Sequence, residues 1–404
     1  MAVNDALETA EAPRCPVVHY DPYKHTPLLG HVQEMDELRE LGPVIRSSYG
    51  LGWYNITRFD DVYDGLRNPG TFSARAKPYE PNPSYQMIPL MLDPPEQTKW
   101  RQLIAPHFSP AAAERLEGHI RAHCANLIET VAKGDGCDFL QDFANRFPTV
   151  IFMEVMGLPI SETERFVEWE TEIIHRTMFL PPDGGENSAK KAAALRQVTD
   201  YFDHVLEERR ETPRDDLLTA CLSWTIDDEP IPREQLVSFC LLLFLAGLDT
   251  VASQLGYSFF HLATHPEDRQ RIVQEPEIIA PAVEELLRVY SFVDAGRKVM
   301  QTVDVGGVHL EAGDMVTLWI PSACRDPRRF HEPDQVNFDR EDNSHIAFGA
   351  GAHRCLGSHL ARMELRIALE EWHKVIPDYR LDETVEPVEY GTMFGPRALA
   401  LRWT

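Results

Sequence analysis

Ten residues near the C-terminal end have types and spacing suited to holding a metal or a cofactor. They run from Phe348 to Gly357 and read Phe-Gly-Ala-Gly-Ala-His-Arg-Cys-Leu-Gly. Gly349, Gly351 and Gly357 clear space around Cys355, so that backbone can approach a flat, bulky group. An apolar helical pattern follows, and a helix N-terminus favours a thiolate over a thiol. A buried structural cysteine beside a tight turn would not need these three glycines, so we expect a thiolate ligand.

A second candidate site follows the most apolar run of the chain. Asp249 and Thr250 come directly after ten apolar residues, 239–248. Burying a carboxylate beside such a run is costly unless it is paired or has a function. Two interpretations stay open from these residues alone. Either a helix reaches the surface here, with Thr250 bonding back to the preceding turn, or the pair performs acid–base chemistry.

Long amphipathic segments must position both sites. Apolar residues recur at helical spacing, several of them after a Ser or Pro start, in residues 109–132, 161–177, 188–211, 232–264 and 276–290. Residues 44–57 and 298–319 have strand patterns, and residues 324–343 predict an ordered meander before the cysteine segment. We therefore expect a mainly α fold with small β-sheets. No linker divides the chain, which favours one domain over residues 1–404.

Composition excludes several classes of function. The formal net charge of -25 repels phosphates, so neither nucleic acid nor an anionic membrane is an expected partner. The longest near-continuous apolar stretch, 236–248, is shorter than the roughly 20 residues of a membrane helix. The first residues lack the pattern of a signal peptide. Seven scattered cysteines favour neither a disulfide framework nor a zinc site, and a cytoplasmic protein is expected.

The segment from Phe348 to Gly357 resembles the haem-binding loop of the cytochrome P450 family, the haem-thiolate monooxygenases. The similarity extends over essentially the whole chain. It implies a triangular helical prism in which haem b lies between a long distal helix and the proximal cysteine loop. Cys355 would be the iron ligand, and a thiolate in that position favours O–O cleavage.

The resemblance also implies roles on the distal side. Asp249 and Thr250 match the acid–alcohol pair of the family, so Asp249 would relay protons and Thr250 would donate a hydrogen bond during O2 activation. Ala246 and Gly247 would leave room above the haem. The implied cofactor-binding set is Cys355, His353, Arg297, Arg101, Phe348, Gly349, Gly357, Ala246 and Gly247.

Charged residues of this set would hold the haem propionates. Arg101, Arg297 and His353 match family positions for that task. Many bacterial relatives carry His where this chain has Gln97, so one propionate contact is expected to be weaker or missing.

A carboxylate–guanidinium pair has an expected structural task. Glu285 and Arg288 are three residues apart on one helical face, a spacing that is common on solvated surfaces and carries little information by itself. By resemblance the pair joins Arg340 of the meander and holds the loop that presents Cys355.

Tyr85 is expected to orient the substrate. Within the family the chain is most similar to terpenoid-oxidising members, among them the camphor hydroxylase, in which a tyrosine at this position donates a hydrogen bond to the substrate ketone. The alternative is an ordinary packed tyrosine in a variable loop. The other implied pocket residues are Leu242, Leu245, Val293, Thr392 and Met393. Ala76 and Leu90 differ from the bulkier or polar residues of the camphor enzyme, so the shape of the pocket need not suit camphor itself. The substrate class implied is a small apolar ketone or alcohol of terpenoid type, camphor-like or norisoprenoid.

Separate proteins are expected to supply the electrons. The sequence has no dinucleotide-binding glycine fingerprint and no iron–sulfur cysteine cluster. The resemblance implies a [2Fe–2S] ferredoxin and a flavoprotein ferredoxin reductase, with NAD(P)H used indirectly, O2 as co-substrate and a monomeric enzyme. Because such ferredoxins are acidic, we expect a basic patch of Lys99, Arg101, Arg354 and Arg362 around the cysteine loop.

Other functions remain compatible with a haem-thiolate loop. A non-catalytic haem sensor would need Cys355 but neither Asp249-Thr250 nor a substrate tyrosine. A peroxygenase or an isomerase is also possible within the family, although such enzymes often replace the acid–alcohol pair, which is intact here. The intact pair favours an O2-dependent monooxygenase.

Overall fold

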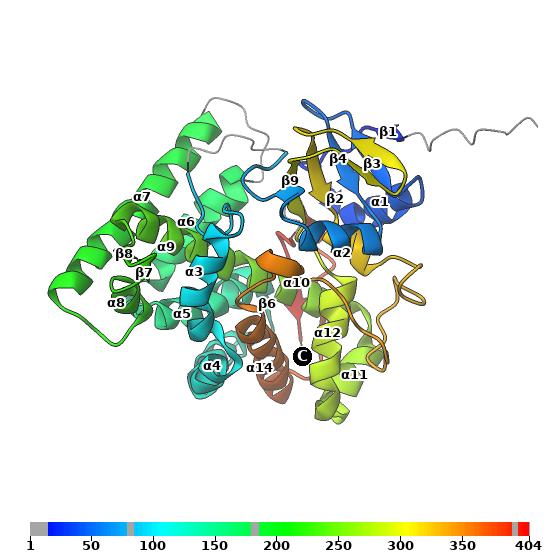
Figure 1. The fold of residues 1–404 in the computed structure, drawn as a ribbon. Helices are drawn as coiled ribbons and strands as arrows, with labels where there is room; N and C mark the ends of the chain where they lie inside the picture. The colour runs from blue at the N-terminus through cyan, green and yellow to red at the C-terminus, as the bar shows by residue number, and fades with distance from the viewer. Residues whose placement is uncertain (1–14, 79–84, 179–185, 390–394, 404) are drawn as a thin grey trace, which may run out of the picture.

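The computed structural model of the chain describes residues 15–78, 85–178, 186–389 and 395–403, and most of them are helical (Figure 1). Its α-helices are α1 (Gly30–Arg39), α2 (Phe59–Arg67), α3 (Glu96–Ile104), α4 (Pro110–Val131), α5 (Arg146–Val155), α6 (Thr163–Glu170), α7 (Glu186–Glu211), α8 (Leu217–Cys221), α9 (Arg233–Gly247), α10 (Asp249–Thr264), α11 (Pro266–Gln274), α12 (Ile279–Val289), α13 (Ile320–Cys324) and α14 (Ser358–Val375). The expectation of a mainly α fold is confirmed.

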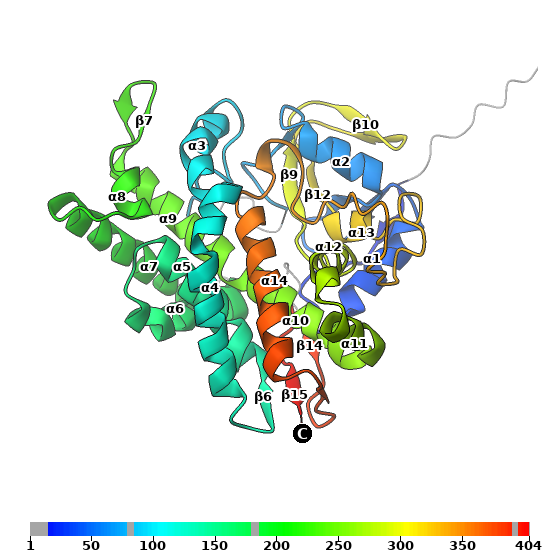
Figure 2. The same ribbon diagram turned by 90° about the horizontal axis from the view of Figure 1, so that it is seen from below.

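Local chemistry explains where the predicted helices begin. Ser109 accepts a hydrogen bond from the N–H of Ala112, and Pro110 occupies the first turn of α4, where its missing N–H is not needed. The segment predicted over 161–177 instead divides, because α6 changes after Glu170 into a π-helical segment, Thr171–Met178. Viewed from below, α14 runs beside α4 and α10, so the helix that follows the cysteine loop is a central support (Figure 2).

The strands are short, and six of them form the largest sheet. They are β1 (Val17–Val18), β2 (Thr26–Pro27), β3 (Val44–Ser47), β4 (Trp53–Ile56), β5 (Phe72–Ser73), β6 (Gly136–Asp138), β7 (Thr225–Ile226), β8 (Glu229–Pro230), β9 (Ala295–Val299), β10 (Val303–Val305), β11 (Val308–Leu310), β12 (Met315–Leu318), β13 (Arg380–Leu381), β14 (Val388–Glu389) and β15 (Ala400–Arg402). Both regions with a predicted strand pattern contribute to it. The largest sheet has the order β1-β3-β4-β12-β9-β5, and Val316 pairs with Tyr54 on one side and Arg297 on the other.

The predicted long helix over 232–264 is interrupted at one residue. Leu248, with φ -93° and ψ -67°, separates α9 from α10. Residues 233–264 together are long and apolar enough to cross a membrane, but 67% of their most apolar window is buried inside the protein. This pair of helices is therefore explained as the core of the fold.

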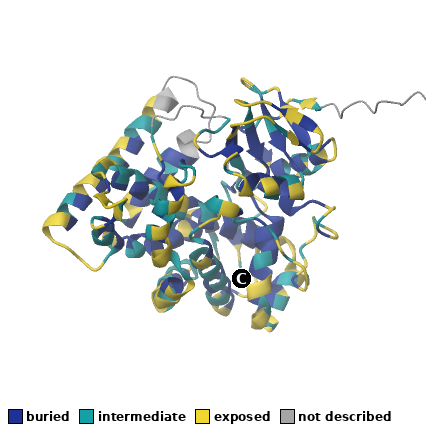
Figure 3. Ribbon diagram, in the orientation of Figure 1, coloured by how far each residue is buried: buried dark blue, intermediate teal, exposed yellow. Residues whose placement is uncertain are grey.

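Three apolar clusters surround the centre of the molecule. One joins α10, α12 and α14, a second joins α5, α7 and α9, and a third lies under the large sheet with α2 and α13. Figure 3 shows the buried faces of the helices turned toward one another. Tight packing on three sides fixes α10 and the segment before α14, which carry the two candidate sites.

Candidate active site

A cavity of about 690 Å³ lies between the two candidate sites. Ala246, Gly247 and Thr250 line one wall, and residues of the cysteine loop, including Cys355, line the opposite wall. Its volume is typical of cofactor and ligand sites. The structure thus brings together the two segments that the sequence pattern singled out.

The sulfur of Cys355 faces this cavity. Its backbone N–H donates to the carbonyl of Phe348 at 2.8 Å, which closes the loop into a tight turn. Burial raises the pKa of the Cys355 thiol, whereas the N–H of Gly357 and the guanidinium of Arg101 lower it. The helix begins at Ser358, so its N-terminus lies directly behind the sulfur. A metal cation at the sulfur would complete the stabilisation of the thiolate.

Two glycines give the loop its shape. Gly349 and Gly351 have φ of 69° and 66°, which side chains rarely tolerate. A Cβ at Gly351 would also lie 2.6 Å from the carbonyl oxygen of Leu66, so α2 packs directly on the loop. Gly357 has an ordinary φ of -76°, and a Cβ there would lie 4.0 Å from the Cys355 sulfur. At this position glycine matters because it has no side chain beside the Cys355 sulfur.

Cationic side chains border the same part of the cavity. Arg101 from α3, Arg297 from β9 and His353 from the loop all line it. Burial, with Arg297 and Arg101 nearby, lowers the pKa of His353 to about 4. The Nε2 atom of His353 is buried and has no hydrogen-bond partner among the described residues. These donors and charges fit a ligand with two carboxylates, and with Cys355 they fit a haem.

Gln97 is placed between α3 and the cysteine loop. It is buried, borders the cavity and donates from Nε2 to the carbonyl of Ala352. The side chain therefore ties α3 to the loop. One of its two amide N–H groups is used by this bond, and the weaker contact to a propionate stays a prediction.

The break between α9 and α10 shapes the distal wall. The Thr250 hydroxyl donates to the carbonyl of Ala246 at 2.8 Å, so the back-bond considered from the sequence is present. Both residues nevertheless border the cavity, so back-bonding and a distal role are compatible. Because its proton is given to Ala246, the Thr250 oxygen can accept a hydrogen bond from the cavity. Among the described residues outside the backbone of its own helix, Phe152 is what a Cβ on Gly247 would meet, at 3.4 Å.

Asp249 faces away from the cavity. It is 1% exposed and does not border the cavity, and Arg397 donates to its Oδ1 from Nη1 at 3.4 Å. The arginine is itself 5% exposed at the side chain, so the ion pair is enclosed. Proton transfer from Asp249 to the cavity would require the carboxylate to turn around the helix.

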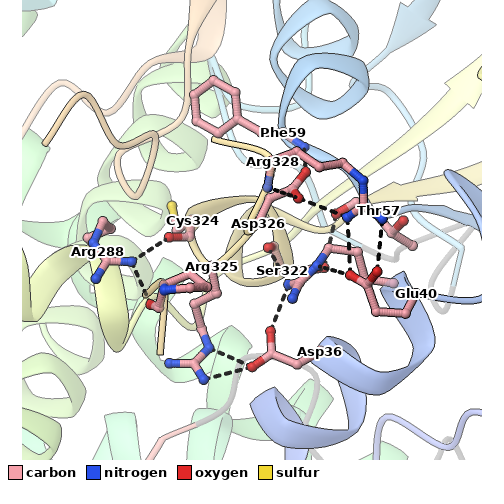
Figure 4. Close-up of polar contacts among 12 residues, drawn as sticks. Asp36, Glu40, Thr57, Phe59, Arg288, Ser322, Cys324, Arg325, Asp326 and Arg328 are labelled. Atoms are coloured by element: carbon pink, nitrogen blue, oxygen red, sulfur yellow. Dashed lines mark hydrogen bonds and ion pairs between the residues drawn. The ribbon is translucent and has the colours of Figure 1, made fainter. Parts of the chain in front are cut away.

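Glu285, Arg288 and Arg340 form a buried network. Arg288 binds Glu285 through Nε at 2.9 Å and Nη2 at 2.8 Å, and Arg340 Nε donates to the same carboxylate at 3.0 Å. Arg288 also donates to the carbonyl of Cys324 at 3.0 Å, next to the Arg325–Asp36 pair (Figure 4). Arg340 donates to the carbonyl of His331 at 2.7 Å. The network joins α12, α13 and the meander that leads to the cysteine loop.

Most residues expected to contact substrate line the cavity. Tyr85, Leu242, Leu245, Val293 and Leu90 border it, and the wall is otherwise mostly apolar. Thr392 and Met393 lie outside the described residues. Ala76 does not border the cavity, although its neighbour Lys77 does, so Ala76 has no support as a pocket residue.

The expected basic patch is largely neutralised. Lys99 is paired with Asp227 in the β7–β8 turn, and Arg362 binds Glu284 at 2.6 Å and 2.8 Å. Arg101 borders the cavity. Arg354 is exposed and also borders the cavity. The prediction of four clustered surface cations was wrong because a basic sequence segment does not reveal which acidic residues fold against it.

Five charged residues at or near the cavity were missed by the sequence, among them Lys77 and Asp294, which border it. Arg397 pairs with Asp249, Lys191 of α7 borders the cavity, and Glu364 of α14 borders it as a buried acid. Burial raises the pKa of Glu364 well above its usual range. A signal existed for Glu364, since it lies four residues after Leu360 on the apolar face of its helix. No comparable signal marked Lys191.

Comparisons with known proteins agree with this geometry. A family model described as Cytochrome P450 matches residues 54–372. The probable cytochrome P450 127A1 of Sinorhizobium fredii is 34% identical over 358 residues, which cover 88% of this chain and 84% of that protein. The mycinamicin IV hydroxylase/epoxidase of Micromonospora griseorubida is 31% identical, over 91% of this chain and 94% of that protein. The crystal structure of CYP101J2 matches with a TM-score of 0.86 at 27% identity, over 96% of this chain and 97% of that chain.

The chain therefore belongs to the cytochrome P450 family, and it is an oxidoreductase of the monooxygenase class. Its cofactor is haem b, used with O2 and with NAD(P)H-derived electrons that arrive through redox partners.

Proposed function

We propose that this chain hydroxylates a small, mostly apolar substrate of terpenoid type, camphor-like or norisoprenoid. The observation that carries the proposal is the set of apolar residues Leu242, Leu245 and Val293, which line the same cavity as the phenol of Tyr85. Such a wall binds a compact hydrocarbon body, and one hydroxyl orients it. The mycinamicin IV hydroxylase/epoxidase is named for another substrate, so the proposal is based on the pocket and not on family membership.

We propose that Cys355 is the iron ligand and that Arg101, Arg297 and His353 hold the propionates. When bound, the haem supplies the iron that activates O2 for insertion into a C–H bond. The chain contributes an enclosed thiolate, cationic partners and a distal wall of small residues. Phe348 and the glycines shape the loop, and Glu285, Arg288 and Arg340 keep it in place.

Thr250 and Asp249 would control proton supply at the distal wall. The Thr250 oxygen, with its proton directed to Ala246, accepts a hydrogen bond from water in the cavity and holds that water in place. Asp249 would exchange its contact with Arg397 for this water, take up a proton from solvent and pass it on to the water.

The remaining expectations concern the enzyme in the cell. We propose a monomer that acts as one domain over residues 1–404 in the cytoplasm, without contact to a membrane or to nucleic acid. A [2Fe–2S] ferredoxin, reduced by a flavoprotein reductase, would dock on the face that carries Arg354, which is exposed beside Cys355.

Spectral titration with terpenoids tests this function. Haem-loaded protein and its Tyr85→Phe variant would be titrated with neutral terpenoid ketones and alcohols, and binding would be followed by the shift of the haem absorption band. We expect binding in both proteins, weaker by about five-fold to ten-fold in Tyr85→Phe because one hydrogen bond is lost. Equal affinity would contradict the role of Tyr85. Hydrogen-peroxide-driven turnover without NAD(P)H-dependent O2 uptake would favour a peroxygenase.

A further inference from the structure

Lys191 brings a positive charge to the wall of the cavity. It lies on α7 with Ala192 and Leu195, which border the same cavity. Its ammonium lies 5.4 Å from the centre of the Tyr85 ring. The tyrosine expected to orient the substrate therefore has a cation against its ring.

The cofactor does not explain this charge. The residues that fit the propionates come from α3, β9 and the cysteine loop. Lys191 comes from α7, which packs on α9 and lies at the left of the molecule, away from β9 (Figure 1). The positive charge of Lys191 therefore reaches the cavity from a different element than the cations that fit the propionates.

Tyr85 and Lys191 bring a phenol and an ammonium side by side to the cavity. The phenol can donate one hydrogen bond and the ammonium can donate three. Two such donors suit an acceptor with two oxygens and a negative charge better than a ketone, which accepts without a charge.

We propose that the substrate carries a carboxylate, which Lys191 and Tyr85 bind together, while its hydrocarbon body extends toward Ala246 and Gly247. The proposal rests on the function proposed above and narrows the substrate class to an acid with an apolar body. It requires only that the ammonium borders the cavity beside the phenol. Lys191 would be a specificity-determining residue, since it acts on one end of the substrate and not on the reacting carbon.

The test compares three probes that differ in one group. Perillic acid, its methyl ester and perillyl alcohol share one hydrocarbon skeleton, and at pH 7.5 only the acid is ionised. Each would be titrated into haem-loaded wild type, Lys191→Met and Lys190→Met, with the haem absorption shift as the readout. Lys190→Met is the matched control, because Lys190 is the neighbouring lysine on the same helix and is exposed.

We expect the wild type to bind the acid roughly ten-fold to a hundred-fold more tightly than the ester. Lys191→Met should remove that preference and leave the dissociation constants of ester and alcohol within about two-fold. Lys190→Met should behave as wild type. The proposal is overturned if the wild type shows no preference for the acid, or if Lys191→Met weakens all three probes equally.

A second set separates this proposal from the proposed function. Dodecanoic acid and its methyl ester would be titrated into the same three proteins. If no perillyl probe shifts the spectrum but dodecanoic acid is preferred and Lys191→Met removes the preference, the terpenoid class fails and the carboxylate anchor stands. If neutral terpenoids bind but neither acid is preferred over its ester, the anchor fails and the terpenoid class stands.

Discussion

At the scale of single residues, the Thr250 hydroxyl group makes one hydrogen bond within the protein and also borders the cavity. Its hydroxyl donates to Ala246, and its oxygen borders the cavity. The back-bond holds the oxygen in one orientation, so that it can accept a hydrogen bond at a fixed place on the distal wall. We propose that this fixed acceptor helps to deliver protons so that O2 activation yields hydroxylated product and not hydrogen peroxide.

Replacing this oxygen should separate electron use from product formation. Thr250→Ala should keep NAD(P)H consumption near the wild-type rate, while hydroxylated product falls on the order of ten-fold and hydrogen peroxide rises. Product, peroxide and NAD(P)H would be measured together in the reconstituted system. Thr264→Ala is the control, since Thr264 bonds back to Phe260 on the same helix but is exposed and outside the cavity. Unchanged product per NAD(P)H in Thr250→Ala would contradict the role.

The sequence predicts single residues well where their neighbours in the chain define them. Cys355 and its glycines, and Thr250 beside Ala246, are local patterns that the structure places on the cavity. Arg397 and Lys191 could not be found in this way. Their importance depends on which distant segments fold against them, and one basic residue among many carries no signal of that.

At the scale of elements, the meander depends on a buried carboxylate. Glu285 is 1% exposed and accepts hydrogen bonds from Arg288, Arg340 and the N–H of Asn337. The Glu285–Arg288 spacing was visible in the sequence, and so was Arg340 as a candidate. The many backbone carbonyls that both arginines also bind were not, because the meander has no periodic pattern that would locate its carbonyls.

Removing one cation should destabilise the protein strongly. Arg340→Met should lower the free energy of unfolding by about 3 to 5 kcal/mol, because Glu285 keeps its burial and loses one partner. Urea unfolding followed by circular dichroism would measure this free energy. The variant should also release haem at a lower urea concentration than the wild type does. Arg329→Met is the control, since Arg329 pairs with the exposed Asp342 and should cost at most about 1 kcal/mol. If both variants lost the same free energy of unfolding, the stabilising role of Arg340 in the Glu285 network would be contradicted.

The α9–α10 break is an element that periodicity did not predict. Apolar residues continue through 233–264 without a helix-ending residue such as proline, so the pattern predicts one helix. The break at Leu248 lies next to Thr250, whose hydroxyl donates to the carbonyl of Ala246 at the cavity. Apolar periodicity carries no information about such a local change in backbone angles.

At the scale of the whole molecule, buried histidines couple stability to pH. Burial lowers the pKa of His373 to about 4, and its Nδ1 donates to the carbonyl of Leu369 while Nε2 faces the Tyr379 hydroxyl. In the unfolded chain histidine binds a proton below about pH 6.5. The unfolded state therefore binds more protons between pH 6.5 and 4, and the free energy of unfolding falls as the pH drops through that window.

His373→Gln should reduce this acid sensitivity. Between pH 6.5 and 4.5 the variant should lose about 2 kcal/mol less than the wild type does, although it is less stable at pH 7 through altered packing. Urea titrations at several pH values would give the difference. His331→Gln should follow the wild-type curve, because His331 is 92% exposed. Parallel curves for wild type and His373→Gln would exclude His373 as a source of the pH dependence.

The strand order of the large sheet also constrains how the chain assembles during synthesis. Tyr54 of β4 pairs with Val316 of β12, and β12 lies between β4 and β9. During synthesis one edge of β4 therefore stays unpaired until β12 has left the ribosome, and by then most of the chain has been made. Such non-local pairing slows folding and exposes strand edges to aggregation. Because Arg297 lies on β9, that side of the cavity should be among the last parts of the protein to form.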